Sequence, residues 1–357
     1  MSHVVRVVPA LPSYVYPQAE ITATIAPLLV GADSERRHLV DRLHAASGVS
    51  TRHLALPLEA YPALTSFGVA NDHFIRLGTE LAEQASRAAL DDAGLTGQDV
   101  DHLLFTSVTG MSAPSIDALL VPRLGLRDDV RRIPSFGLGC VAGAAGLARV
   151  HDYLQGHPDQ AALLVAVELC SLTVQHGDDS MANLVSSAIF GDGAAAALLV
   201  GDDHRLAQGS PLAVVDSRSV LYPDTADQLG WHIGASGLRI VLSAALSDVI
   251  RTHLADDVTR LLEPHDLKAR DITTWVVHAG GPRIIDAVQE ALDLDATALV
   301  RTRESLAEVG NLSSVSVLDV LARTLDAPRP AAGHMVLLAF GPGVSAELVL
   351  LRWKGDA

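Results

Sequence analysis

One cysteine follows a strand-like segment and precedes a helix-like one. Cys140 lies in the sequence FGLGCVAGAAG, residues 136–146, and a small-residue helix is predicted from about residue 141 to 153. A thiol at a helix N-terminus faces free backbone N–H groups and the positive end of the helix dipole, which favour the thiolate. This indicates a nucleophile for acyl transfer. A small buried cysteine beside a tight turn is the alternative, and the segment alone supports both equally.

Two further segments place polar side chains where strands or helices end. His278 follows a strand-like run in WVVHAGGP, residues 275–282, and the glycines after it leave the imidazole open at a turn. Asn311 lies in VGNLSS, residues 309–314, at the position of a helix N-cap, and capping alone would account for it.

A cysteine, a histidine and an asparagine at such junctions fit acyl transfer coupled to carbanion formation. A thiolate accepts the acyl group, and a neighbouring imidazole keeps it ionised. Imidazole and carboxamide N–H groups can then hydrogen-bond a thioester carbonyl and stabilise the enolate that forms when a carboxylate leaves as CO2. This chemistry needs no metal ion and no bound cofactor.

The segments that must hold these side chains alternate between strand-like and helical patterns, which predicts an α/β fold with largely buried sheets. The strand-like runs span residues 102–108, 131–136, 161–170, 194–200, 212–221, 273–279, 334–340 and 346–353. The helical patterns span residues 79–93, 141–153, 240–262, 283–292 and 312–325. A turn-rich stretch separates a first lobe, residues 1–208 with Cys140, from a second, residues 209–357 with His278 and Asn311.

The composition excludes several functional classes. The net charge is 26 − 42 = −16, which argues against a generic nucleic-acid or anionic-membrane surface, so an anionic ligand needs a local cluster of cations. Two cysteines in 357 residues do not form a disulfide framework. The N-terminal segment has no signal-peptide pattern, and no run of about 18 apolar residues could span a bilayer. We therefore expect a soluble cytoplasmic enzyme.

The three segments, in this order, resemble the type III polyketide synthases, the chalcone synthase-like branch of the thiolase-fold condensing enzymes. The resemblance extends from about Val5 to Trp353 and includes FGDGAAA, residues 190–196, and FGPG, residues 340–343. It implies a thiolase-like fold of two similar βαβαβ-type lobes in α-β-α-β-α layers. It also implies that Cys140 carries the acyl chain, and that His278 and Asn311 activate it and assist decarboxylation of malonyl-CoA.

The resemblance assigns further residues to the substrate cavity. They are Ala113, Cys170, Thr173, Phe190, Trp231, Ile240 and Ser313, and Glu168 falls beside them. Phe190 matches the first of two gatekeeper phenylalanines, whereas Ile240 replaces the second. Trp231 stands where many members carry a small residue, so it would reduce the cavity volume unless it is a core residue. Cys170 is expected to be a packing thiol and not a second nucleophile.

For coenzyme A, the resemblance implies a contact with Arg42, near which Arg36, Arg37 and Arg52 lie in sequence. The family's two usual lysines are missing, at or near Leu39 and Ala46. Further predicted contacts are Gly280, Gly281 and Arg283, the last at the start of a helix, where an anion is favoured. A homodimer is implied as well, in which Ala113 of one subunit reaches the cavity of its partner.

The product is predicted from resemblance within the family. Segments such as residues 71–76 and 114–117 look closest to bacterial alkylresorcinol and alkylpyrone synthases, which indicates an aliphatic acyl-CoA starter extended with malonyl-CoA or methylmalonyl-CoA. A tetrahydroxynaphthalene or small-pyrone synthase is an alternative. An acyl-carrier-dependent ketoacyl synthase would have HQAN where this chain has HAGG from His278, and a degradative thiolase would need a cysteine beyond Cys170. A non-catalytic acyl-CoA-binding protein would not need all three site residues.

Overall fold

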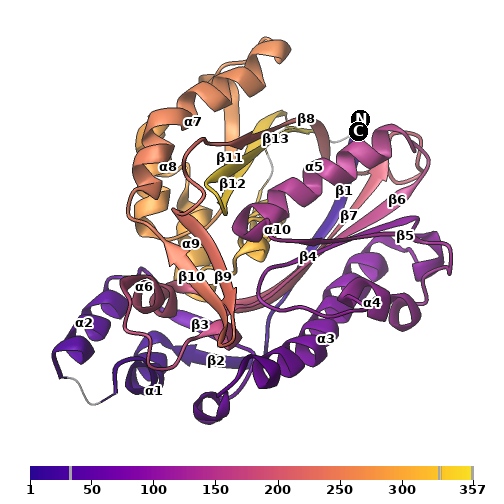
Figure 1. The fold of residues 1–357 in the computed structure, drawn as a ribbon. Coiled ribbons are helices and arrows are strands. Elements are labelled where there is room, and N and C mark those ends of the chain that lie inside the picture. Colours follow the sequence, from indigo (N-terminus) through magenta and orange to yellow (C-terminus); the bar gives the residue numbers. More distant parts are fainter. Residues whose placement is uncertain (32–33, 329, 331, 355–357) are drawn as a thin grey trace.

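The computed structural model describes residues 1–31, 34–328, 330 and 332–354 (Figure 1). The described elements of the first half are β1 (Ser2–Ala10), β2 (Tyr14–Pro17), α1 (Gln18–Val30), α2 (Ser34–Ala45), β3 (Thr51–Leu54), α3 (Phe67–Ala93), β4 (His102–Ser107), α4 (Ile116–Leu124), β5 (Arg131–Phe136), α5 (Ala142–Gln155), β6 (Ala161–Leu169), α6 (Met181–Ile189) and β7 (Asp192–Gly201). Those of the second half are β8 (Leu212–Leu221), β9 (Leu229–Gly234), β10 (Gly237–Leu242), α7 (Leu246–Leu262), β11 (Ile272–Val277), α8 (Pro282–Ala291), α9 (Val300–Val309), α10 (Ser314–Asp326), β12 (Gly333–Gly341) and β13 (Ser345–Trp353).

Hydrogen bonds join nine of these strands in the order β11-β12-β13-β8-β1-β7-β6-β4-β5. The pairs β4–β5, β4–β6 and β11–β12 are parallel, and the remaining pairs are antiparallel. The two halves of the sheet meet only through a short pairing of β1 with β8, residues 2–4 against residues 212–214. Each half therefore comes from one half of the chain.

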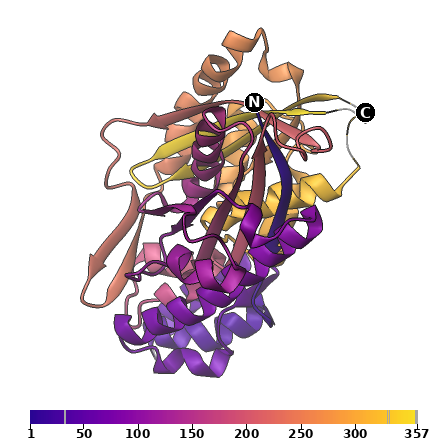
Figure 2. The same ribbon diagram turned by 90° about the vertical axis from the view of Figure 1, so that its right-hand side faces the viewer.

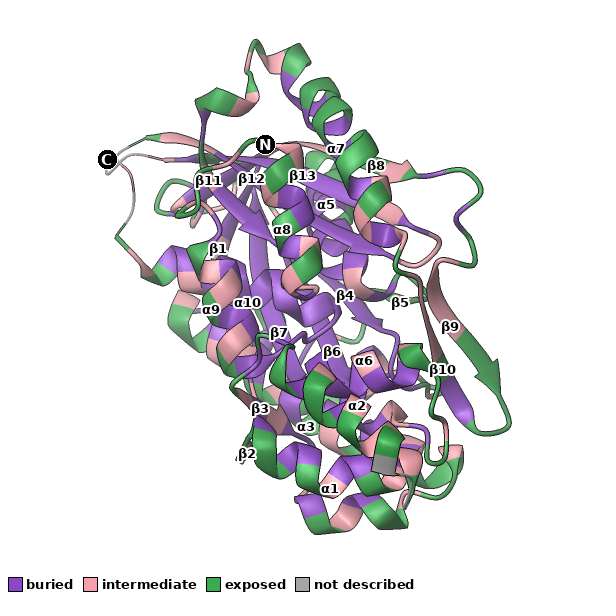
Figure 3. Ribbon diagram, turned by 90° about the vertical axis from the view of Figure 1, so that its left-hand side faces the viewer, coloured by how far each residue is buried: buried purple, intermediate pink, exposed green. Residues whose placement is uncertain are grey.

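The helices cover this sheet in layers. One apolar core joins α1, α3 and α4 to the outer face of the first half, and another joins α7, α8 and α9 to the outer face of the second. The third core holds α5 and α10 between the two halves. Strand β6 is buried on both faces, since Leu163 and Val165 face the outer core while Leu164 and Ala166 face the central one. Figure 3 shows this buried interior, and its α-β-α-β-α layers are those expected of the thiolase-like fold.

The two central helices approach each other closely at their N-termini. A Cβ atom on Gly143 of α5 would collide with the carbonyl oxygen of Ser314 and would lie 2.7 Å from Cγ1 of Val317. Only glycine permits this approach. The contact brings the start of α5, which follows Cys140, against the start of α10, which follows Asn311.

One predicted helix starts in the wrong place. Residues 240–262 were expected to be helical, but Ile240 lies in β10, where it pairs with Trp231 of β9, and the helix starts at Leu246. β-branched side chains such as those of Ile240 and Val241 favour strands when a partner strand is present. The β9–β10 hairpin stands out from the body of the molecule (Figure 2). None of the described helices is both long and apolar enough to cross a membrane.

Candidate active site

Cys140 lies in a 3₁₀ turn, Gly139–Val141, that leads directly into α5. The preceding Gly139 has φ +56°, and a Cβ atom there would lie 2.7 Å from Cδ of Pro342. A Cβ atom on Gly341 would likewise lie 2.7 Å from Cβ of Val141. The turn that carries the thiol is therefore fixed against the loop between β12 and β13, and the glycines permit the contact.

Burial controls the ionisation of the Cys140 thiol. Burial raises its pKa to about 12, with a smaller contribution from the charge of Glu168, although a hydrogen bond with Ser313 opposes the rise. The dipole of a helix contributes up to about 2 kcal/mol, or about 1.5 pKa units, which is less than this rise. Burial therefore opposes the thiolate that the position before α5 favours, and the thiolate stays a prediction.

The Cys140 thiol donates a hydrogen bond to Oγ of Ser313 at 3.5 Å. The Ser313 hydroxyl in turn donates to Oε1 of Glu168 at 3.2 Å. Ser313 has φ +52°, a conformation that serine rarely adopts, and its N–H donates to Oδ1 of Asn311 at 2.8 Å. Ser313 therefore contacts the nucleophile, and its contact with the substrate stays a prediction.

Glu168 is fully buried at the end of β6, where it accepts hydrogen bonds from several elements. Oε1 also accepts from the Ser314 hydroxyl at 2.6 Å, and Oε2 accepts from the backbone N–H of Val108 at 3.1 Å and the Thr109 hydroxyl at 2.9 Å. Burial raises the pKa of this carboxyl. Glu168 thus ties β6 to the segment after β4 and to the start of α10.

His278 follows β11 and is only 3% exposed. Burial lowers the pKa of its imidazole to about 4, so the ring is neutral at physiological pH. Nδ1 has no hydrogen-bond partner within the described residues. A Cβ atom on Gly280 would lie 3.2 Å from Cδ2 and 3.4 Å from Nε2, so this glycine keeps space beside the ring. In the described chain no hydrogen bond joins His278 to Cys140.

Asn311 lies two residues before the N-cap of α10, which is Ser313, so the predicted N-cap position was wrong. Its carboxamide Nδ2 donates to the carbonyl oxygen of Gly280 at 3.2 Å. Its Oδ1 accepts from the Ser313 N–H and from the Ser316 hydroxyl. Asn311 therefore connects the His278 segment to the Cys140–Ser313 pair, and one of its two amide N–H bonds stays available for a ligand.

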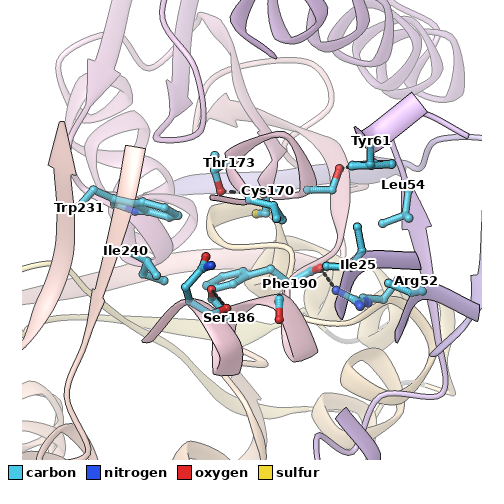
Figure 4. Close-up of a pocket in the computed structure, with 15 residues that line it drawn as sticks. Ile25, Arg52, Leu54, Tyr61, Cys170, Thr173, Ser186, Phe190, Trp231 and Ile240 are labelled. Carbon is cyan, nitrogen blue, oxygen red and sulfur yellow. Dashed lines mark hydrogen bonds between the residues drawn. The ribbon is translucent and has the colours of Figure 1, made fainter. Parts of the chain in front are cut away.

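A cavity of about 480 Å³ collects five of the predicted substrate residues (Figure 4). They are Cys170, Thr173, Phe190, Trp231 and Ile240. In Figure 4, Phe190 lies near the centre, with Trp231 and Ile240 on one side and Arg52 on the other. Burial raises the pKa of Cys170 well above its usual value, as expected of a packing thiol. Ala113 is exposed and lines none of the cavities found in the described chain.

Arg52 is also part of this cavity, where its side chain is 3% exposed. Its proximity to Arg42 in the sequence suggested that it contributes to the basic coenzyme A mouth. The structure instead places it in the wall of the smaller cavity.

A larger cavity, of about 1310 Å³, lies between α2, α6 and α8. Gly280, Gly281 and Arg283 line it, and Arg283 is the only charged residue among its described lining residues. Arg42 does not line it, but Ala46, which directly follows the last residue of α2, does. The structure thus brings three of the four predicted coenzyme A residues to one cavity and leaves Arg42 exposed beside it.

Comparisons with known proteins decide the family. The model for the N-terminal domain of chalcone and stilbene synthases matches residues 2–204, and the model for their C-terminal domain matches residues 213–354. The chain belongs to this family. It is a type III polyketide synthase, and thus an acyltransferase that uses coenzyme A thioesters.

Individual relatives agree with this assignment. The polyketide synthase is 54% identical over 348 residues to 1,3,6,8-tetrahydroxynaphthalene synthase of Streptomyces peucetius subsp. caesius, covering 96% of this chain and 91% of that protein. It is 30% identical to the alpha-pyrone synthesis polyketide synthase-like Pks18 of Mycobacterium tuberculosis, covering 95% and 88%. The crystal structure of 1,3,6,8-tetrahydroxynaphthalene synthase from Streptomyces coelicolor A3(2) superposes with a TM-score of 0.92 at 32% identity, covering 99% of this chain and all of that chain. The thiolase-like fold is thereby confirmed.

Proposed function

We propose that this type III polyketide synthase builds a short aromatic polyketide of the tetrahydroxynaphthalene type from malonyl-CoA. The observation that carries the proposal is the 54% identity, over nearly the whole chain, to a 1,3,6,8-tetrahydroxynaphthalene synthase. The carbon count agrees with malonyl-CoA as sole substrate, because five malonyl groups that lose five molecules of CO2 supply the ten ring carbons. Five molecules of coenzyme A are released.

In the proposed mechanism, Cys140 carries the chain. The neutral His278 accepts the thiol proton as sulfur attacks the starter thioester, and it returns the proton to the departing coenzyme A thiolate. Ser313 holds the thiol in place beforehand. The buried and uncharged imidazole suits this role, because a protonated histidine could not accept the proton.

Extension uses the same polar groups on a second substrate. N–H groups of His278 and Asn311 donate to the thioester carbonyl of malonyl-CoA, and they stabilise the enolate that forms as the carboxylate leaves as CO2. The enolate carbon attacks the thioester on Cys140, the new C–C bond forms, and the cysteine sulfur leaves. The lengthened chain then returns to Cys140 for the next cycle. Arg42 and Arg283 are proposed to bind coenzyme A phosphates at the larger cavity, alongside Gly280 and Gly281.

An alkylresorcinol or alkylpyrone synthase is the second candidate. The apolar part of the smaller cavity favours it, since Ile240 replaces an aromatic gatekeeper and lies with Ile21, Ile25 and Leu54 in the wall. The similarity to the Pks18 proteins points the same way. A medium- or long-chain acyl-CoA would then be the starter, and methylmalonyl-CoA could serve as extender.

A homodimer is proposed as the working form. The edge strand β5 and the turn after it expose Ile133, Phe136 and Leu138, and Met111 is exposed in the segment that also carries Ala113. Exposed apolar side chains at a sheet edge favour association. Ala113 would then reach the cavity of the partner, which its exposed position allows.

Product analysis separates the two candidates. Purified enzyme is incubated with malonyl-CoA alone and with malonyl-CoA plus acyl-CoA starters from six to sixteen carbons, and products are identified by mass spectrometry. A tetrahydroxynaphthalene-type product from malonyl-CoA alone is expected, with none from Cys140→Ala. If any of the aliphatic starters outcompetes malonyl-CoA, the alkyl product is the better assignment.

A further inference from the structure

Arg52 lines the substrate cavity and has a buried hydrogen-bond donor without a partner. Its Nε donates to Oε1 of Gln18 at 3.0 Å, and its Nη1 donates to the carbonyl oxygen of Phe190 at 2.7 Å (Figure 4). Nη2 is buried and has no partner within the described residues. A buried donor without a partner is costly, and more so when it carries charge. The guanidinium is thus held rigidly by two bonds while its third nitrogen is left free.

The guanidinium is charged and lacks a carboxylate in contact with it. Burial lowers its pKa only to about 10, so it is a cation at neutral pH. Asp192 is the nearest source of negative charge in its surroundings, yet no ion pair joins the two in the described structure. The oxygens of Asp192 instead accept from the N–H groups of Ala55 and Ser171 and from the Ser171 hydroxyl.

Most of the other polar side chains in the cavity wall are already bonded to protein acceptors. The Tyr61 hydroxyl pairs with that of Ser171, which donates to Asp192. The Thr173 hydroxyl donates to the carbonyl oxygen of Cys170 at 2.7 Å. Asn183, Ser186 and Ser187 donate to backbone carbonyl oxygens. Among the described lining residues, Arg52 Nη2 is therefore the one buried side-chain donor without a partner.

The position of Arg52 links this donor to the catalytic residues. A Cβ atom on Gly310, the neighbour of Asn311, would lie 3.2 Å from Cγ of Arg52. Phe190, whose carbonyl oxygen binds Arg52, forms a bridge with Asn311. Cys170 lies within electrostatic range of both Cys140 and Arg52. The cavity, whose described lining includes Cys170 but not Cys140, thus lies near the nucleophile as well as the guanidinium.

We propose that Arg52 is a specificity-determining residue whose Nη2 binds an acceptor oxygen on the acyl chain carried by Cys140. The cavity would then select chains that bear a carboxylate or a β-carbonyl oxygen over alkyl chains of equal length. This inference rests on the proposed function, because it assumes that Cys140 holds the chain. Two sources supply the same chemistry, namely the carboxylate of a malonyl starter and the β-carbonyl of a growing polyketide.

A matched pair of starters tests the proposal. Acetoacetyl-CoA and butanoyl-CoA have equal chain lengths and differ by one carbonyl oxygen. In wild-type enzyme, kcat/KM for acetoacetyl-CoA should exceed that for butanoyl-CoA. Arg52→Met should lower this ratio by about 10- to 100-fold, the value of a hydrogen bond to a charged group. Arg251→Met removes the same charge from an exposed position on α7 and should leave the ratio unchanged.

Arg52→Lys gives a second variant if Arg52→Met does not fold. A single ammonium group cannot contact Gln18, the Phe190 carbonyl and a substrate oxygen at once, so the ratio should fall several-fold. Three results would overturn the proposal: a wild-type preference for butanoyl-CoA, an equal loss with both starters, or a folded Arg52 variant in which the ratio and the malonyl-primed products are both unchanged.

A third starter, malonyl-CoA, shows whether Arg52 binds the starter carboxylate or a β-carbonyl oxygen. If only malonyl-primed products decrease in the Arg52 variants, Arg52 binds the starter carboxylate, whereas a matching decrease with acetoacetyl-CoA identifies the β-carbonyl. The starter ratio does not depend on how the ring closes. A wild-type enzyme that makes an alkylpyrone would therefore refute the proposed product while leaving the role of Arg52 measurable.

Discussion

Replacing Ser313 with alanine tests the electrostatic setting of the nucleophile. Ser313 Oγ lies 3.5 Å from the Cys140 sulfur, and once the thiol has lost its proton the hydroxyl can turn from Glu168 and donate to the thiolate, which opposes the rise in the thiol pKa that burial causes. A hydrogen bond of this kind contributes about 0.5–1.5 kcal/mol, which corresponds to about 0.4–1.1 pKa units. Ser313→Ala should therefore lower the thiolate fraction at neutral pH by roughly twofold to twelvefold.

The assay is alkylation by iodoacetamide, which reacts with the thiolate. Mass spectrometry of peptides separates Cys140 from Cys170. With a pKa of about 12, the wild-type rate at Cys140 should rise about tenfold per pH unit between pH 6 and 9 without a plateau. Ser313→Ala should give a parallel line at lower rates. Ser314→Ala serves as the control, because this hydroxyl also donates to Glu168 but does not touch the thiol.

Two results would refute this reasoning. A plateau below pH 7 would show that the thiol and His278 form a thiolate–imidazolium pair, so that burial does not control the ionisation. A rate in Ser313→Ala that equals or exceeds the wild-type rate would show that Ser313 does not stabilise the thiolate.

Three further predictions concern catalysis, product length and stability. Asn311→Ala should reduce malonyl-CoA decarboxylation by about 10²–10³-fold while leaving thiol alkylation nearly intact, and unfolding instead would assign Asn311 to the start of α10 alone. Trp231→Gly removes a large side chain from the cavity wall and so enlarges the cavity. Product masses should therefore increase, because the enzyme accepts longer starters or adds another extension unit. Lowering the pH from 7 to 5 should destabilise the fold in denaturant titrations, because His44 and His102 have folded pKa values of about 3 and 4 against 6.5 when unfolded. The unfolded state then binds more protons, which costs about 2 kcal/mol per histidine at pH 5. Asp192, whose folded pKa is raised to about 6, opposes this by about 1 kcal/mol, and a higher denaturation midpoint at pH 5 than at pH 7 would contradict the prediction.

The fold was predictable where hydrophobic patterns are long. Strands β5 and β8 have the predicted bounds, and the remaining predicted strands agree within a few residues. The start of the 240–262 helix was wrong because Ile240 and Val241 fit a helical period as well as a strand, and only the pairing with β9 decides between them. Elements such as α1, α2 and α6 were not predicted, because their packing depends on partners distant in sequence.

The site was predictable to the extent that turns and family motifs mark it. Cys140, His278 and Asn311 were identified in sequence, and hydrogen bonds through Ser313 and Gly280 connect their segments in space. The ionisation of the thiol was not predictable, because it depends on how completely α5 and α10 exclude water. The burial of Arg52 was missed for the same reason. One signal was present for Glu168, which is a single carboxylate within an apolar strand.

An acyl chain on the proposed path from Cys140 to Arg52 would have a buried charged group at each end. Glu168 lies beside the nucleophile and raises the pKa of Cys140, whereas Arg52 lies beyond Cys170 and keeps a free N–H donor. A chain that ends in an oxygen therefore gains by pointing that end toward Arg52 and away from Glu168, while an alkyl chain gains nothing from either charge. Because both groups are at most 3% exposed, water screens this difference little. The polarity of the cavity thus favours an extended, oxygenated chain over a folded apolar one before any ring closes.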